Sequence, residues 1–316
     1  MHLQESRRKD LRLRCFFVEK DAGAFSELQR FAESQSDIEI ECRNAPFEDA
    51  IPEITRFIAK DRKTFSFIFI DPTGWTGFAM NLISPLLKQR PSEVLVNLMT
   101  GHITRLIETH APRKQFEELF GSADFRSQVT GLSGLDRIDA CVGAYCESLR
   151  RFGDFGFVCP AFVLRPERDR PHFNLIYATR KDKGVEEFKR AEKQAMQVME
   201  SERAKREERT RLGAVQKGLF STTEMPESAY YRELRQRYLD RIERELTIQL
   251  SVQKQVEYSE LWKTSLALPL VWEEDLRNLL LQWKAKGMIE LPSLGRRRFP
   301  NRQANDIVVW KADAAE

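Results

Sequence analysis

A short apolar run that ends on a carboxylate constrains the fold of this chain most. Residues 66–70 read SFIFI, and Asp71, Pro72, Thr73 and Gly74 follow directly. A continuous apolar run of this length is typical of a strand that is covered on both faces. Pro72 fixes its own φ and favours an extended Asp71, while Gly74 can adopt positive φ and leave space for a ligand. The run predicts a buried strand whose turn is either functional or only structural.

Strands and helices alternate around this run. Apolar runs predict further strands at 15–18, 38–42 and 93–99, and helical periodicity predicts helices at 24–32, 52–60 and 80–89. Such alternation predicts an α/β, Rossmann-like fold with a parallel sheet and right-handed crossovers. Residues 156–164 and 172–179 flank a polar turn, which predicts an antiparallel pair of strands at the edge of the sheet.

The character of the chain changes after Lys183. Residues 186–212 predict a highly charged helix, either solvated or used for a partner, and the stripe of apolar residues in 229–250 predicts a packed helix. The last segment reads helix, helix, strand, basic loop, strand, which is the order of a winged-helix module. We therefore expect three parts: a Rossmann-like domain over 1–185, a charged helical connector over 186–256 and a winged-helix-like domain over 257–316.

The C-terminal loop is the main candidate for contact with nucleic acid. The net charge is only +3, which argues against a basic field over the whole surface but allows a local basic patch. Arg296, Arg297, Arg298 and Arg302 fall on this loop. Four guanidinium groups on one hairpin can contact the phosphates of DNA or RNA. The alternative is a winged helix that binds protein or is purely architectural.

Cysteine and histidine usage gives no sign of a metal site. The five cysteines form no CxxC pair, and Cys15, Cys42 and Cys159 lie in apolar, strand-like segments. This pattern predicts buried, reduced thiols. His102 follows a predicted strand, where it is either a general base or a capping residue, and His110 and His172 lack metal spacing. Because no apolar run reaches about 18 residues, we expect a soluble, cytoplasmic protein that does not enter the membrane.

Polar residues stand at the ends of three predicted strands. Glu19 closes the first strand, Asn44 follows the second and Asp71 closes the third. In doubly wound sheets, ligands bind beyond the carboxyl ends of the strands, and a carboxylate there can accept hydrogen bonds from two ribose hydroxyls. We therefore expect these three side chains to lie together in one crevice.

At these positions the sequence resembles a bacterial family, the three-Cys-motif partner (TcmP) proteins. The similar segments are FFVEKDAGAFSELQRF, FSFIFIDPTGWTGFAMNLISPLL, EVLVNLM and FNLIYATRKDKGVEEFKRA. The resemblance runs from about Leu11 to Met196, and more loosely through the C-terminal segment. It implies a methyltransferase-like Rossmann fold with S-adenosylmethionine as cofactor. It also implies a separate partner protein that carries three cysteines and is related to radical S-adenosylmethionine enzymes.

The resemblance also implies roles for individual residues. Glu19 would hold the ribose, and Asn44, Ala45 and Phe47 would flank the adenine. The turn of Asp71, Pro72 and Gly74 would lie beside the transferred methyl group or the substrate. In amino-methyltransferases, a turn of this kind accepts hydrogen bonds from the target nitrogen.

The sequence departs from the family at the first strand and its Gly-rich turn. No glycine precedes Gly23, and only 14 residues precede Cys15. Three explanations stay open: a start site assigned too late, a natural loss of catalysis, or a first strand donated by another chain. The function is accordingly either a methyltransferase acting on nucleic acid or a partner protein, or an inactive scaffold that binds through its winged helix.

Overall fold

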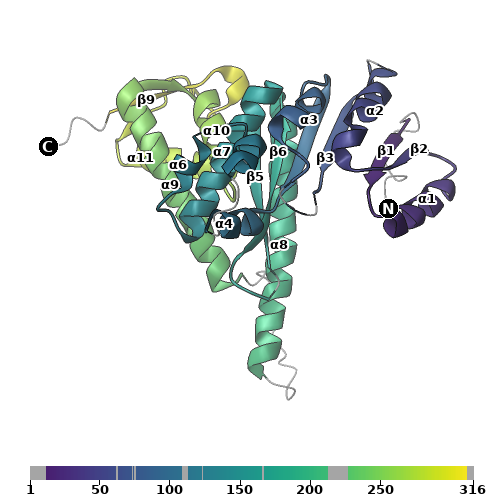
Figure 1. The fold of residues 1–316 in the computed structure, drawn as a ribbon. Coiled ribbons are helices and arrows are strands. Elements are labelled where there is room, and N and C mark those ends of the chain that lie inside the picture. Colours follow the sequence, from purple (N-terminus) through teal and green to yellow (C-terminus); the bar gives the residue numbers. More distant parts are fainter. Residues whose placement is uncertain are drawn as a thin grey trace.

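The computed structural model describes residues 12–61, 63–72, 74, 76–108, 113–122, 124–165, 167–212 and 227–311. It is a mixed α/β structure with three groups of hydrogen-bonded strands. Figure 1 shows the N-terminal strand pair at one side of the molecule and the C-terminal helices at the other, with a larger sheet between them. The α/β class predicted from the sequence is therefore confirmed.

The first group is a two-stranded parallel sheet. Strands β1 (Arg14–Glu19) and β2 (Glu39–Asn44) are joined by helix α1 (Ala22–Glu33). The side chain of Asp21 caps this helix by accepting a hydrogen bond of 2.8 Å from the N–H of Ala24. No residue of β1, α1 or β2 is buried, so this βαβ unit forms with little core of its own.

The second group is a four-stranded sheet in the order β3, β4, β6, β5. Strand β3 (Ser66–Ile70) is parallel to β4 (Ser92–Leu98), and β6 (Pro171–Thr179) runs antiparallel to both β4 and β5 (Phe157–Leu164). The predicted strand over 66–70 and the predicted antiparallel pair are confirmed. Helix α2 (Phe47–Ala59) leads from β2 to β3, and α3 (Met80–Leu87) leads from β3 to β4.

Four further helices connect β4 to β5. They are α4 (Thr100–Glu108), α5 (Arg113–Phe120), α6 (Phe125–Val129) and α7 (Gly134–Gly153). Helix α7 supplies Tyr145 and Cys146, which are buried in one apolar cluster with α3 and one face of the sheet.

The expectation of one continuous parallel sheet is wrong. In the described residues, β1 and β2 pair only with each other, and no strand hydrogen bonds link them to β3. The two sheets are connected instead through α2, whose Phe57 ring lies 5.3 Å from the Phe16 ring of β1. The local pattern of strand and helix was sufficient to place the elements but not to pair them.

The expectation that β3 is covered on both faces is also wrong. Ile68 and Ile70 are 8% and 3% exposed and pack into the apolar cluster, whereas Phe67 and Phe69 are 56% and 52% exposed. Successive side chains of a strand point to opposite faces, so one whole face of β3 is open. On that side of the sheet, the helix that follows β6 packs on β5 and β6 instead, as the stacking of Tyr177 on Phe188 at 4.7 Å shows.

The C-terminal region forms a compact module of helices around a small antiparallel sheet. Helix α8 (Asp182–Leu212) is followed by α9 (Ala229–Gln253), β7 (Gln255–Glu257), α10 (Tyr258–Leu266), α11 (Glu273–Ala285), β8 (Ile289–Glu290), a short 3-10 helix (Arg302–Ala304) and β9 (Ile307–Trp310). The strands pair in the order β7, β9, β8. Gly287, at φ +73°, follows the end of α11, as the KG pair after its last periodic residue indicates.

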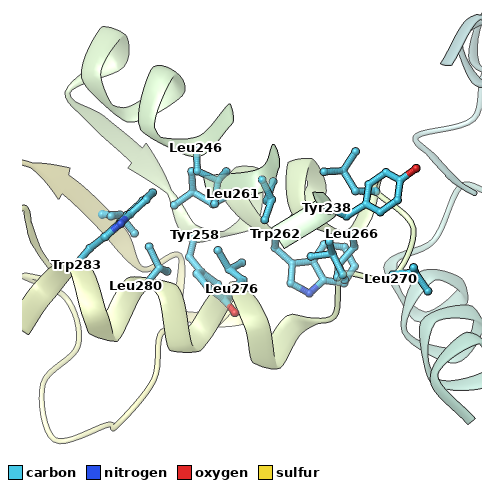
Figure 2. Close-up of a cluster of buried hydrophobic side chains, with 14 of the residues drawn as sticks. Tyr238, Leu246, Tyr258, Leu261, Trp262, Leu266, Leu270, Leu276, Leu280 and Trp283 are labelled. Atoms are coloured by element: carbon cyan, nitrogen blue, oxygen red, sulfur yellow. The ribbon is translucent and has the colours of Figure 1, made fainter. Parts of the chain in front are cut away.

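Figure 2 shows the core of this module, in which side chains of α9, α10 and α11 interlock. Trp262 and Trp283 are each 1% exposed, and Tyr238 is fully buried. The apolar stripe of α9 is buried in this same cluster, which confirms that it serves packing. Helix α9 thus packs with the C-terminal module across the expected boundary at residues 256/257.

The two long helices are charged, but one side of α8 is buried. Lys189 Nζ donates to the carbonyl of Leu268 at 2.6 Å, and Glu192 accepts a hydrogen bond of 2.9 Å from the N–H of Leu270. The Lys189–Glu192 ion pair, at 2.9 Å, has side chains only 5% and 1% exposed. Helix α8 therefore binds the α10–α11 connection directly. Among the described helices, none combines the length and apolar character needed to cross a bilayer.

Candidate functional site

Glu19 and Asn44 meet at the carboxyl end of the first sheet. They are register partners in β1 and β2, and Asn44 Nδ2 donates to the carbonyls of Glu19 and Lys20 at 2.8 and 3.2 Å. Glu19 Oε1 accepts a 2.8 Å hydrogen bond from the N–H of Asp21. The amide of Asn44 therefore fixes the end of β1, while the half-buried Glu19 carboxylate keeps its other oxygen for a ligand.

The loop after β2 offers little further recognition chemistry. Ala45 is half-buried and provides only backbone groups and a methyl. Phe47 begins α2 and packs against the apolar cluster under that helix. A ring so placed is held by the core, which leaves only its remaining exposed part for contact with an adenine.

Asp71 lies at the carboxyl end of β3 and is paired with a residue that the sequence reading did not single out. Asn97 of β4 donates its Nδ2 to Asp71 Oδ1 at 2.6 Å. The Asn97 side chain is 7% exposed, and its Oδ1 is buried without a hydrogen-bond partner. The sequence signal was an amide within the apolar strand EVLVNLM, where a polar side chain needs a partner. The pair fixes the orientation of an exposed carboxylate at the rim of the sheet.

Among the described residues that follow Asp71, the glycine with positive φ is Gly77 rather than Gly74. Gly74 has open space around its Cα but does not adopt positive φ. Gly77 does, at +86°, and a Cβ there would lie 3.0 Å from Glu48 Oε2. The left-handed conformation expected at Gly74 is therefore found three residues later, while Pro72 is half-buried beside the turn.

The three polar residues at the strand ends do not lie in one crevice of a single sheet. Glu19 and Asn44 are together in the first sheet, whereas Asp71 belongs to the second. S-adenosylmethionine needs backbone amides near its methionine part. The Gly-rich turn of the family that this sequence resembles supplies them. The described residues between Glu19, Asn44 and Asp71 provide no such strand and turn. The residues present therefore do not fit this cofactor by themselves.

Buried polar groups beyond the rim are structural. Thr100 Oγ1 donates to Asn174 Oδ1 at 2.8 Å, with both side chains fully buried below α4. Leu98 opposes Asn174 in the register of β4 and β6, so Asn174 and Asn97 point to opposite faces of the sheet. His102 and His172 are exposed, and the N–H of His102 donates to the Met99 carbonyl in the first turn of α4. His110 lies outside the described residues.

Two of the four arginines proposed for phosphate contact form ion pairs with other residues of the chain. Arg297 makes two hydrogen bonds of 2.6 Å to Asp306, whose side chain is 2% exposed. Arg302 pairs with Asp182 and Glu186 of α8. Its guanidinium also lies 3.8 Å from the centre of the Trp262 ring. These two arginines fasten the loop and join the module to α8.

The other two arginines are exposed. No ion pair of Arg296 or Arg298 is found in the described part of the chain, and Arg298 lies 5.1 Å from the ring of its neighbour Phe299. Within the described residues, two of the four predicted guanidinium groups therefore stand without an ion pair and two with one. The loop that carries them consists of turns between β8 and the 3-10 helix.

The thiols are free, and their burial divides them into two groups. Cys141, Cys146 and Cys159 are buried, and burial raises their pKa values to about 12, 12 and 11. Cys15 and Cys42 are only half-buried, which corrects the expectation of burial for these two, and partial burial raises their pKa values. In the described chain, no group of three or more His, Cys, Asp or Glu side chains is placed to hold a metal ion.

A cavity of about 230 Å³ lies between the edge strand β5 and helix α10. Arg150, Cys159, Lys263 and Thr264 are among its lining residues. None of the predicted site residues lines it, so this cavity is a feature of the contact between the sheet and the C-terminal module.

Comparison with known proteins does not assign the chain. No family model matches it, and a search of curated proteins finds no match. The functional reading therefore depends on the geometry of the chain and on the resemblance in its motifs.

Proposed function

We propose that this chain is a methyltransferase-like binding protein that does not hold S-adenosylmethionine on its own. The separation of β1 from β3 is the observation that carries this proposal. The βαβ order, the carboxylate at the end of β1 and the reversed strand β6 support a methyltransferase-like Rossmann origin. The same separation leaves the cofactor cradle incomplete, because its two halves lie in different sheets.

The Asp71 rim is the part of the site that is best prepared to bind a substrate group. Asn97 holds the Asp71 carboxylate by one oxygen, which leaves the exposed side of that carboxylate for a hydrogen-bond donor such as an amine. We infer that this rim receives the acceptor nitrogen in active relatives. In this chain the rim serves as a binding surface unless the cradle beside it is completed.

Titration calorimetry with S-adenosylmethionine tests the proposal. We expect no binding heat from the folded chain, since the residues that the structure describes supply no strand and turn whose amides could surround the methionine part. Circular dichroism on the same sample controls for folding. A dissociation constant tighter than about 100 μM, or about −5.5 kcal/mol, would favour the alternative, an active S-adenosylmethionine-dependent methyltransferase.

The C-terminal module supports a protein partner better than a nucleic acid. Its order of helices and strands is the order expected of a winged helix. In that fold, the first residues of the second helix of the helix-turn-helix pair contact DNA. In this module the pair would be α10 and α11. Here that helix, α11, begins with Glu273, Glu274 and Asp275, whose ion pairs with Arg277, Lys193 and Arg235 leave no excess of positive charge among these residues for phosphates. We therefore propose that the module binds protein, with the three-cysteine partner implied by the resemblance as the first candidate.

Salt dependence of binding to a DNA or RNA duplex checks the choice of partner class. We expect weak binding that is the same for the wild type and for the Arg296→Ala/Arg298→Ala double variant. If these arginines contact phosphates, the slope of log affinity against log salt should fall by about one for each lost contact. That result would favour the hypothesis that the loop binds nucleic acid.

A further inference from the structure

We propose that the cavity between β5 and α10 binds a small organic anion, a monocarboxylate that carries a compact apolar group. The volume of this cavity is about 230 Å³. An apolar protein cavity of about 150 Å³ is large enough to bind benzene, so this one has room for a single ring together with its carboxylate. The Asp71 rim is not part of this cavity, and the inference does not depend on the function proposed above.

The inner wall of the cavity is apolar and buried. Val158 and Cys159 of β5 are 1% and 2% exposed. Val185 of α8 is fully buried, and Leu266 of α10, which Figure 2 shows in the core of the C-terminal module, is 3% exposed. Because burial raises the pKa of Cys159 to about 11, its thiol is protonated at neutral pH and acts as a small apolar group. Such a wall favours an apolar ligand group that displaces water from it.

The charged side chains in the lining are both cationic. Arg150 of α7 and Lys263 of α10 line the cavity, and their side chains are 35% and 46% exposed. No aspartate or glutamate is found among the described residues that line it. The lining therefore has two positive charges next to a buried apolar wall. This arrangement attracts a negatively charged group to the exposed side of the cavity.

Each of the two cations has a carboxylate partner that lies outside the lining. Arg150 pairs with Glu147 at 3.5 Å, and Lys263 pairs with Glu260 at 2.6 Å. The carboxylate side chains are 74% and 52% exposed, and ion pairs so open to solvent contribute little free energy. Water and salt screen these pairs, so both cations remain able to bind an anion in the cavity.

The guanidinium of Arg150 is well placed for a carboxylate. It has five N–H donors in one plane. Among the described residues, its hydrogen bonds are long: 3.5 Å to Glu147 and 3.4 Å to the carbonyl of Val158. Because N–H···O bonds are usually about 2.7–3.2 Å long, both contacts are weak. The contact with Val158 holds the guanidinium beside the cavity, where two of its N–H groups can bind both oxygens of one carboxylate.

The wall and the guanidinium together select the class of ligand. Inorganic phosphate binds to a guanidinium but gains nothing from an apolar wall. A neutral apolar molecule covers the wall but leaves the donors of Arg150 without an acceptor. A monocarboxylate with a small ring or branched chain satisfies both. It would contact α7, β5 and α10 at once, so its binding should also stabilise the contact between the sheet and the C-terminal module.

Titration of the full chain with benzoate, followed by ligand-observed NMR, tests this inference. We expect a dissociation constant of about 1 mM, which is reasonable for a ligand with so few atoms. Benzyl alcohol has the ring without the charge, and inorganic phosphate has the charge without the ring. Both should bind at least about tenfold more weakly than benzoate. Benzylamine, in which an ammonium group replaces the carboxylate, should not bind.

Three variants locate the binding site. Arg150→Gln removes the charged guanidinium and should raise the dissociation constant of benzoate at least about tenfold. Arg190→Gln is the matched control, because Arg190 pairs with Glu187 three residues before it, as Arg150 does with Glu147, and does not line the cavity. It should bind benzoate as the wild type does. Ala267→Phe fills the cavity from its lining and should abolish binding with Arg150 in place. Circular dichroism controls for folding in each case.

Several outcomes would overturn the proposal. The first is no binding of benzoate at about 10 mM, ten times the expected dissociation constant. Equal affinity for benzyl alcohol would show an apolar cavity in which the cations have no role, and equal affinity for phosphate would show an ion site without the wall. Unchanged affinity in Arg150→Gln would place the bound benzoate elsewhere on the protein, whether or not Ala267→Phe folds.

Discussion

The N-terminal and C-terminal regions of this molecule are both built of helices and short strands, but they differ in how far their side chains are buried. In the C-terminal module, α9, α10 and α11 enclose Tyr238, Trp262 and Trp283, all nearly inaccessible to solvent. In the N-terminal βαβ unit, no residue of either strand or of α1 is buried. A sheet or helix is stable when its apolar face is covered by another layer. The comparison shows that the described C-terminal module encloses a core of its own and that the described N-terminal βαβ unit does not.

The largest expected effect comes from removing a C-terminal core aromatic. Trp262 is 1% exposed and packs edge-on against Phe157 at 5.9 Å, so Trp262→Ala should lower the free energy of unfolding by about 3–5 kcal/mol. Phe67→Ala on the open face of β3 should lower it by less than about 0.5 kcal/mol. Urea unfolding followed by circular dichroism measures both. A loss at Phe67 as large as that at Trp262 would show that the face is covered in solution.

The buried ion pair on α8 should give the next largest effect. Glu192 accepts hydrogen bonds from Lys189 and from the N–H of Leu270, and both side chains of the pair are nearly inaccessible. Glu192→Gln leaves the Lys189 ammonium buried without its counter-charge, so we expect a loss of about 3 kcal/mol in unfolding free energy.

Glu187→Gln, on the same helix, is the matched control for this ion pair. Glu187 is half exposed in its pairs with Lys183 and Arg190, and the stability should not change measurably. If the two variants unfold alike, the contact between α8 and the α10–α11 connection does not stabilise the protein.

A smaller, pH-dependent effect should separate the two regions further. Hydrogen bonds from Arg297 lower the pKa of Asp306 below its ordinary value. A carboxyl whose folded pKa is lowered stabilises the protein above its unfolded pKa of about 4, and this contribution is lost as pH falls toward the folded pKa. The stability difference between the wild type and Asp306→Asn should therefore shrink between pH 5 and pH 2. A difference that stays constant over this range would mean that the pair does not form.

The sequence predicted the positions of helices and strands far better than the burial of their side chains. The strand over 66–70 and the end of α11 at Gly287 follow from local pattern and backbone preference, so they were found. The three-residue strand β7 was missed, because three residues carry no period. The exposure of Phe67 was misjudged, because burial depends on whether another layer covers the strand.

The candidate site shows the same limit. Glu19 and Asp71 were placed at strand ends from local pattern alone, and both are there. That Asn97 holds Asp71, and that Arg302 is taken up by Asp182, depends on residues distant in the sequence. A single sequence does not encode such partners in any local signal, so the ion pairs of Arg297 and Arg302 were not foreseen.

The smallest expected effect, and a sensitive one for the comparison, is the reactivity of the thiols. At pH 8, a pKa of about 12 leaves about one thiol in ten thousand as the reactive thiolate, and Cys141 and Cys146 are also sterically inaccessible. Cys15 and Cys42 lie half-exposed in the uncovered sheet, so Ellman's reagent should label these two in the native protein. Cys159 and the two α7 thiols should react only on unfolding.

A native protein in which all five thiols react slowly would contradict this expectation and would mean that the N-terminal sheet is already covered.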